Sequence, residues 1–396
     1  MDGENTTALE IEVLPGIDRV SAADWDACAA PERADSGPAL NPFVTHAFLH
    51  ALEESGSATP RTGWQPQHLV ARVDGQAVGA MPLYLKSHSQ GEYVFDHSWA
   101  HAFERAGGDY YPKLQGAVPF TPATGPRLLV NPNAGVAPQA VRSALLEGGA
   151  QLCDRHGLSS LHVTFCTDEE WHLGGQLGLL QRTDQQFHWQ NDGYTSFDAF
   201  LDALASRKRK TLRKERAKAV ENGIRIHWLT GEAIRPEHWE AFWIFYQDTG
   251  SRKWGRPYLT RAFFDLVTES MADALLLIMC ERDGRWVAGA LNIIGRETLF
   301  GRYWGCTEDH PCLHFETCYY QAIEFAIEHG LKRVEAGAQG GHKLARGYGP
   351  VVTRSLHHIA HPGLRDAIDR YLEAEREAVE SEAEALLDMT PFKKSG

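Results

Sequence analysis

An α/β fold built from two similar halves is predicted by repeated turn signals. In each half, two apolar runs flank an Asp-Gly pair, Asp74-Gly75 in the first and Asp283-Gly284 in the second. Asp-Gly suits the positive φ of a tight hairpin turn. Each half then continues with a helix that ends in His-Gly-Leu, at 156–158 and 329–331, and with a short apolar strand. Glycine commonly supplies the positive φ that follows a helix. Because the order of elements recurs, we interpret the chain as a tandem duplication.

Length and composition indicate a globular protein with two domains. The chain has 396 residues, of which 43% are hydrophobic and 23% are charged, which is long for a single core. It has no apolar run of membrane-spanning length, and the polar, acidic start MDGENTTALE does not resemble a secretory signal. We therefore expect a cytoplasmic protein without membrane insertion. Its seven cysteines lack CxxC pairs, which favours free thiols over a disulfide framework.

The first domain is expected over residues 1–195 and contains an additional segment, 86–127. This segment is rich in aromatic residues, His, Gly and Pro, and its periodicity is weak. Long segments of this kind in a compact domain are usually functional or disordered, and the aromatic content argues against disorder. Two interpretations remain open, an acceptor groove or a small core that covers the first sheet. The residues that would line the groove are Lys86, Trp99, Tyr111 and Lys113.

A basic helix is expected over residues 196–223, between the two domains. Of the fourteen residues 206–219, eight are Lys or Arg and one is acidic. The net charge of the whole chain is −13, which argues against a general nucleic-acid coat. The basic run is either a solvated helix face or a surface that contacts phosphate or RNA. The residues of this candidate patch are Arg207, Lys208, Arg209, Lys210 and Arg213.

The second domain, 224–396, contains the densest group of polar and aromatic side chains, between Gly301 and Gly349. We expect an extended segment up to Trp304, a helix over 313–329, a buried strand over 331–336 and a Gly-rich loop after it. Open α/β sheets usually bind ligands at the carboxyl ends of their strands. A C-terminal helix follows over about 363–385, and the tail beyond about residue 382 is expected to be frayed.

These features resemble those of a known superfamily. The order hairpin, strand, helix, strand is that of a GNAT acyltransferase core, and a tandem pair joined by a basic helix resembles the Fem peptidoglycan ligases, which use aminoacyl-tRNA. The segments SRKRKTLRKERAKA, SRKWGRPYLT, AGALNIIG, LFGRYWG, LHFETCYYQAIEFAIE and VEAGAQGGHKLARGY are similar to the FemAB-like family of peptidoglycan biosynthesis or recognition proteins. The resemblance spans roughly Asn41 to Tyr371. It implies tandem GNAT-like domains, each a mixed, mostly antiparallel sheet flanked by helices.

The resemblance also implies a role for one lysine. Fem ligases carry a K-x-x-F-G segment after the last core strands, and its lysine lies beside the reacting ester of the donor. Residues 343–347 read KLARG, so Lys343 matches and Arg346 replaces the aromatic residue. Lys343 would then stabilise a developing oxyanion. The donor would be either aminoacyl-tRNA or acyl-CoA. Glu308 and Asp309 occupy the loop where acetyl-CoA enzymes carry phosphate-binding glycines, which weakens the case for acetyl-CoA.

Acyl transfer to an amine requires a base and groups that stabilise an oxyanion. The candidate bases are Glu316 and Glu335, which complete a catalytic set with Lys343. Alternatively, Glu316 is an ordinary acid in the first turn of a helix, and Glu335 belongs to a buried ion pair. Further donor-binding or substrate-binding candidates are Arg302, Tyr303, His314, Gln339, His342 and Arg346.

Three functions remain open from the sequence. The first is transfer of an acyl or aminoacyl group to a small-molecule or peptide amine, with tRNA contacting the basic helix. The second is acetyl-CoA-dependent N-acetyl transfer. The third is non-catalytic binding of a cell-wall precursor or peptide. His, Cys and Glu residues alternate between His310 and Cys318, but their spacing is not that of a zinc site, so we expect no metal.

Overall fold

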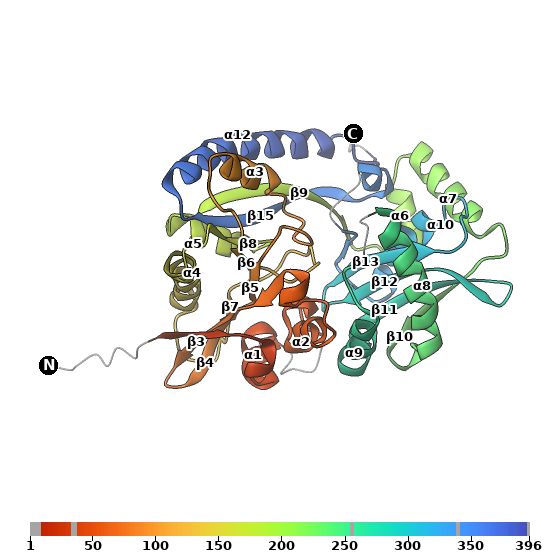
Figure 1. The fold of residues 1–396 in the computed structure, drawn as a ribbon. Helices are drawn as coiled ribbons and strands as arrows, with labels where there is room; N and C mark the ends of the chain where they lie inside the picture. Colours follow the sequence, from red (N-terminus) through yellow and green to blue (C-terminus); the bar gives the residue numbers. More distant parts are fainter. Residues whose placement is uncertain (1–8, 33–37, 254–256, 338–340, 394–396) are drawn as a thin grey trace. The chain divides into compact units, whose positions relative to one another are not determined.

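The structure, a computed structural model, describes residues 9–32, 38–253, 257–337 and 341–393 (Figure 1). The chain divides into two compact units. Unit 1 comprises Met1–Ser36, Phe43–Asp184 and Thr353–Val379; unit 2 comprises Gly37–Pro42, Gln185–Val352 and Glu380–Gly396. The units interleave along the chain, unlike the contiguous halves expected from the sequence, because strands β9 (Leu180–Gln190) and β15 (Gly349–Ile359) each begin in one unit and end in the other.

Unit 1 contains two groups of hydrogen-bonded strands. One has the order β1-β3-β4-β7, and the other has the order β15-β8-β6-β5-β2, in which β6 and β8 are parallel. The strands are β1 (Glu10–Leu14), β2 (Trp64–Pro66), β3 (His68–Val73), β4 (Gln76–Met81), β5 (Leu83–Lys86), β6 (Lys113–Gly116), β7 (Leu129–Val130) and β8 (Ser160–Thr164). The helices are α1 (Ala22–Ala29), α2 (His46–Glu54), α3 (His97–Arg105), α4 (Pro138–Arg155) and α5 (Asp168–Gln176).

The first hairpin forms as its turn residues predict. Asp74 and Gly75 both have positive φ, at 50° and 79°, and they join β3 to β4. The apolar run after this turn does not continue as one strand. Pro82 separates β4 from β5, because proline has no N–H to donate to a strand ladder.

Unit 2 has one sheet in the order β10-β11-β12-β13-β14-β9, in which only β13 and β14 are parallel among the described strand pairs. The strands are β10 (Arg225–Thr230), β11 (Leu275–Arg282), β12 (Arg285–Ile294), β13 (Thr298–Cys306) and β14 (Arg333–Glu335). The helical segments include α6 (Phe197–Ala203), α7 (Ser206–Val220), α8 (Pro236–Lys253), α9 (Arg261–Met271), α10 (Leu313–Phe315), the π-helical turn η7 (Glu316–Tyr320), α11 (Gln321–Glu328) and the 3-10 helix η8 (Gly341–Arg346). Asp283 and Gly284 again have positive φ in the β11–β12 turn.

Helices cover both faces of the unit 2 sheet. On one face α8 approaches closely because Gly289 and Gly305 have no side chain; a Cβ on Gly305 would lie 2.1 Å from the backbone oxygen of Phe245. On the other face, Ala290 belongs to the main core of the unit together with Ile323 of α11. The fold of both units is therefore mixed α/β with helices against the sheets, as the sequence predicts.

The C-terminal region differs from the expectation of a frayed tail. Helix α12 runs from Pro362 to Leu387, and beyond it Phe392 forms a β-bridge with Leu204. Phe392 also packs its ring against Phe200, so burial of an aromatic side chain holds this segment in unit 2. No helix in the described part of the chain has the length and apolar character needed to cross a bilayer.

Candidate active site

The sheet of unit 2 opens between β13 and β14. The two strands pair only from Thr298 to Phe300, which lie opposite Arg333 to Glu335. Directly afterwards, Arg302 is an extra residue in β13, because Leu291 of β12 pairs with Tyr303 and Asn292 pairs with Gly301. A bulge of this kind bends its strand, and bulges are frequent beside active sites. Among the described residues, β13 beyond Phe300 has a strand partner on the β12 side only. Beyond Phe300, the edge of β13 that faces β14 is therefore unpaired in the described sheet, and we call this place the opening.

Lys343 lies at the end of β14, beside this opening. Its Nζ donates a hydrogen bond to the carbonyl oxygen of Gly337, two residues after β14, at 2.7 Å. Lys343 is 1% exposed. Burial lowers the pKa of the Lys343 ammonium to about 8. A desolvated ammonium interacts strongly with a developing negative charge, because little water screens it.

Glu335 and His188 meet across β14 and β9. They lie opposite each other in the strand register, with His188 Nε2 3.8 Å from a carboxylate oxygen of Glu335. Arg333 Nε lies 3.4 Å from the other carboxylate oxygen. Burial lowers the pKa of His188 to about 3, helped by the charges of Arg333 and Lys343. A neutral imidazole, a carboxylate and a desolvated ammonium therefore occupy one region of unit 2. The sequence analysis missed His188, because nothing near it in sequence distinguishes it from any other histidine in a strand.

Glu316 is held in an ion pair. It lies in the π-helical turn η7, and such turns are frequent at functional sites. Arg216 Nε and Nη2 donate to Glu316 Oε1 at 3.1 and 2.9 Å, and Gln321 donates to the same oxygen at 2.7 Å. The Glu316 side chain is 3% exposed. These contacts correspond more closely to a buried ion pair than to the solvated acid of a first helical turn.

Aromatic and histidine side chains surround η7. His342 Nε2 and the Tyr319 hydroxyl are 2.8 Å apart, and His314 packs its ring edge-on against Tyr319. Arg302 lies 5.3 Å from the centre of the Tyr303 ring, and burial raises the pKa of Tyr303. The structure thus brings His314, His342 and Tyr319 together in unit 2. Gln339, a further sequence candidate, lies outside the described residues.

A comparison with protein families finds one family that matches nearly the whole chain. The model of the FemAB-like family, described as peptidoglycan biosynthesis or recognition, matches residues 16–394. The chain belongs to the FemAB-like family. No curated protein matches this FemAB-like chain significantly.

Solved structures share its tandem GNAT-like fold. The structure of FemX is 12% identical, with a TM-score of 0.53, and the match covers 88% of this FemAB-like chain and 98% of FemX. L-PGS from Bacillus licheniformis is 11% identical over 87% of this chain and 98% of its own, with a TM-score of 0.49. A tandem GNAT protein from the clavulanic acid biosynthesis pathway is 16% identical over 90% and 99%, with a TM-score of 0.47. At such identity, the likeness to FemX shows a common fold and nothing about substrates.

Arg346, three residues after Lys343 in η8, is also held by an acid. Its Nη2 lies 3.0 Å from Glu215 of α7, and the hydroxyl of Tyr320 donates to the same carboxylate. The guanidinium lies 3.5 Å from the centre of the Phe315 ring, close enough for a cation–π contact. Arg346 thereby links η8 to α7 and α10 within unit 2.

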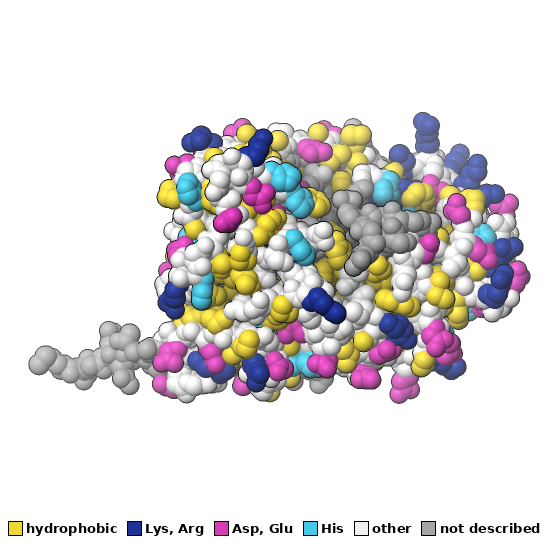
Figure 2. Space-filling model, viewed as in Figure 1, with side chains coloured by type: hydrophobic (Ala, Val, Ile, Leu, Met, Phe, Trp, Pro, Cys, Tyr) yellow, Lys and Arg dark blue, Asp and Glu magenta, His cyan; other side chains and the backbone are white. Residues whose placement is uncertain are grey.

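Helix α7 of this FemAB-like protein presents most of its basic side chains to solvent. Dark blue side chains gather where α7 lies (Figure 2). Arg209 and Arg213 pair with Asp202 and Asp198, at 2.7 and 3.2 Å. Arg207 and Lys208 form no ion pair with any other described residue, and both line a pocket with Arg346.

The candidates of the additional segment belong to unit 1; Lys86, Trp99 and Lys113 are buried, and Tyr111 is partly buried. Lys86 and Lys113 are both 0% exposed. Lys113 Nζ donates to Glu92 at 2.7 Å and also to Asp96, whereas Lys86 Nζ lies 3.6 Å from the centre of the Trp64 ring. Trp99 packs in an apolar cluster, and Tyr111 shares a hydrogen bond with Ser89. These contacts fit the small-core interpretation, and the groove stays a prediction.

One group of potential metal ligands occurs among the described residues, and it lies in unit 1. Ligand atoms of Cys153, Asp154 and His358 lie within 4.8 Å of one another. Burial raises the pKa of the Cys153 thiol to about 12, and the thiol donates to the Leu158 carbonyl oxygen. His358 Nε2 lies 2.8 Å from Asp154 Oδ1, so the thiol and the imidazole of this group each have a partner within the protein.

Proposed function

We propose that this FemAB-like protein transfers an acyl or aminoacyl group to the amine of a cell-wall precursor or peptide. The observation that carries the proposal is the buried Lys343 ammonium at the opening between β13 and β14. The family description, peptidoglycan biosynthesis or recognition, supports the choice of acceptor. The GNAT-like fold supports acyl transfer as the reaction class, although a fold alone does not determine function.

In the proposed reaction, the acceptor amine attacks the carbonyl carbon of an ester or thioester. A C–N bond forms and the C–O or C–S bond breaks. The amine loses a proton, and the leaving alcohol or thiol gains one. Lys343 stabilises the oxyanion of the tetrahedral intermediate. Glu335 accepts the proton, directly or through water, since Glu316 is already held by Arg216.

The loop after β13 favours an aminoacyl ester over acyl-CoA as donor. Glu308 in this loop pairs with Arg282 at 3.0 Å and with His310 at 2.9 Å. Asp309 is exposed beside it. Two acids at the position where GNAT enzymes bind a pyrophosphate oppose such an anion, and the local cations are engaged by Glu308. We therefore propose aminoacyl-tRNA as the donor.

The test supplies both donor classes in parallel. The purified protein is incubated with a pool of charged tRNAs carrying labelled amino acids, or with a pool of labelled acyl-CoA, together with cell-wall precursor peptides. We expect label on a peptide amine with charged tRNA only. Label from acyl-CoA alone would instead indicate an N-acetyltransferase. Binding of the peptides without transfer from either pool would contradict catalysis and support a recognition protein.

A further inference from the structure

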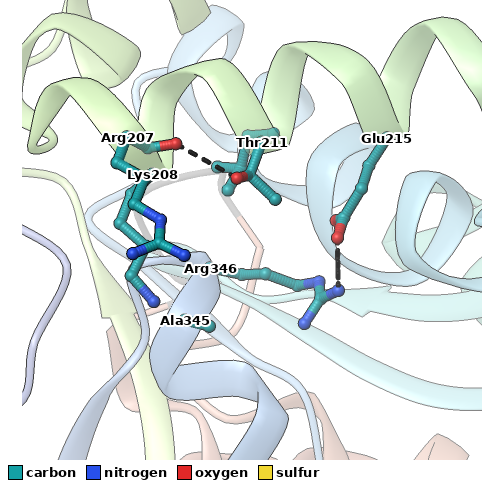
Figure 3. A pocket seen from close by; sticks show the side chains of 7 residues that line it. Arg207, Lys208, Thr211, Glu215, Ala345 and Arg346 are labelled. Atoms are coloured by element: carbon teal, nitrogen blue, oxygen red, sulfur yellow. Dashed lines mark hydrogen bonds and ion pairs between the residues drawn. The ribbon is translucent and has the colours of Figure 1, made fainter.

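A pocket of about 370 Å³ lies in unit 2 between α7 and η8 (Figure 3). Its volume falls at the lower end of the range for small-molecule sites, roughly 300–1,000 Å³. The pocket is built from two segments that are more than a hundred residues apart in sequence. Its lining residues are Arg207, Lys208, Thr211, Leu212, Glu215, Ala345 and Arg346.

Three of the lining side chains are cationic and one is anionic. Figure 3 shows Arg207 and Lys208 extending from α7 toward Ala345, and Arg346 extending beneath the helix toward Glu215. Arg207 and Lys208 are exposed and have no ion-pair partner among the described residues. The Arg346 side chain is 8% exposed. Its Nε is buried and has no hydrogen-bond partner in the described structure. The pocket thus has a cationic excess in a chain whose net charge is −13.

We propose that this pocket binds a phosphate ester of the acyl donor through Arg207, Lys208 and Arg346. Guanidinium groups match phosphate oxygens geometrically, and a partly buried guanidinium binds them more strongly than a solvated one. Arg346 is the pocket cation that is most buried, and its Nε has no hydrogen-bond partner in the described structure, so it can donate to an anion that enters the pocket. The assignment of the phosphate to a donor rests on the proposed function, whereas phosphate binding does not.

Glu215 would compete with a bound phosphate for Arg346. Its carboxylate oxygens accept from Arg346 Nη2 at 3.1 and 3.0 Å, where a phosphate oxygen would otherwise bind. The Glu215 side chain is 20% exposed, so it can turn toward solvent when a ligand enters. Loss of the Glu215 charge should therefore tighten phosphate binding, whereas loss of a pocket cation should weaken it.

Calorimetric titration of the full-length protein tests the proposal with two probes. One is the RNA trinucleotide CCA, which carries the phosphodiesters of a tRNA 3′ end. The other is adenosine 3′,5′-bisphosphate, which carries phosphates of coenzyme A. Binding of either probe supports the site, and the probe that binds more tightly identifies the source of the phosphate.

We expect Arg207→Gln and Arg346→Gln each to weaken binding about tenfold or more, since each removes a charged hydrogen bond. Glu215→Gln should strengthen it several-fold.

Lys214→Gln is the matched control, because it removes the same charge from an exposed position of α7 that does not line the pocket. We expect its affinity to stay within about twofold of the native value. Equal weakening by Lys214→Gln and Arg207→Gln would overturn the proposal, as would failure of both probes to bind. Arg207 is exposed, so its variant stays informative if Arg346→Gln does not fold. Binding without acyl transfer would leave the pocket intact and remove only the proposed function.

Discussion

Arg216 holds Glu316 through two nitrogens, although the residues are far apart in sequence. Nε and Nη2 of Arg216 lie 3.1 and 2.9 Å from Glu316 Oε1, and Nη2 also lies 2.5 Å from Glu324. The pair joins α7 to the π-helical turn η7 and to α11. A carboxylate with these partners is poorly placed to accept a substrate proton, so we assign Glu316 to the support of α7.

Replacing Arg216 by Met should destabilise the protein by about 2 kcal/mol. The substitution leaves the buried Glu316 carboxylate without its cation, and breaking a buried pair costs roughly 3–5 kcal/mol when both partners are buried. Arg216 is 23% exposed, which reduces the cost. Urea unfolding measures the change. Arg213→Met is the control: its pair with Asp198 is exposed and should contribute less than about 0.5 kcal/mol. Equal effects would contradict the assignment.

Substitution of the two buried lysines of unit 1 should destabilise the protein to very different extents. Burial alone lowers the pKa of Lys113, but Glu92 and Asp96 outweigh it and raise the pKa above its usual value. Burial lowers the pKa of Lys86 to about 7. Lys113→Met should therefore cost roughly 3–5 kcal/mol, because two buried acids lose their cation. Lys86→Met should change the free energy of unfolding by less than about 1 kcal/mol, in either direction. Chemical denaturation at pH 7 compares them; similar losses would refute the distinction.

Transfer activity should decline as pH rises through about 8. Burial lowers the pKa of Lys343 to about 8, so its ammonium loses its proton well below the usual value for lysine, near 10.5. The oxyanion then loses its cationic partner. A pH–rate profile of kcat measures the decline. In the Lys343→Arg variant the side chain stays charged, because arginine remains protonated throughout this pH range. The activity that this variant retains should therefore not decline near pH 8. An unchanged profile in this variant would show that another group titrates.

The protein should lose stability in acid through the histidine pair of unit 1. His162 Nδ1 and His357 Nδ1 are 2.6 Å apart and fully buried, close to Asp96, Lys113 and Arg182. Burial lowers the pKa of His162 to about 3, so the folded state requires the neutral ring. The stabilisation is complete above the unfolded pKa, near 6.5, and is lost as pH falls toward 3.

Replacement of His162 should reduce the loss of unfolding free energy in acid. Between pH 7 and 4.5, His162→Gln should lose on the order of 2 kcal/mol less unfolding free energy than the native protein. The comparison uses guanidinium unfolding at both pH values, so that a lower stability of the variant at pH 7 does not affect the difference. Equal pH dependence in the two proteins would contradict a role for His162.

Local chemistry explains which elements of the fold could be predicted. Asp283 and Gly284 have the positive φ that a tight turn requires, at 51° and 74°. Gly157 and Gly330, at 63° and 67°, follow their helices in the same way. These conformations depend on neighbouring residues alone, so the sequence is sufficient to predict them.

Long-range pairing explains what could not be predicted. His188 meets Glu335 because β9 joins β14 across the sheet, and no residue near His188 indicates that contact. Glu215 and Arg216 lie within the basic run, yet their partners are Arg346 and Glu316. The buried cluster of Lys113, Glu92 and Asp96 in the additional segment was not predicted either, because lysines are rarely fully buried.

The most direct test of the central claim is the transfer rate of Lys343→Met. Labelled aminoacyl-tRNA and precursor peptide are supplied to the native protein, to Lys343→Met and to Lys332→Met, a control with an exposed lysine beside β14. Loss of one oxyanion-stabilising group usually costs about a hundredfold to a thousandfold in rate. We predict such a loss in kcat for Lys343→Met, with an unchanged rate for Lys332→Met. Full activity of Lys343→Met would contradict the account.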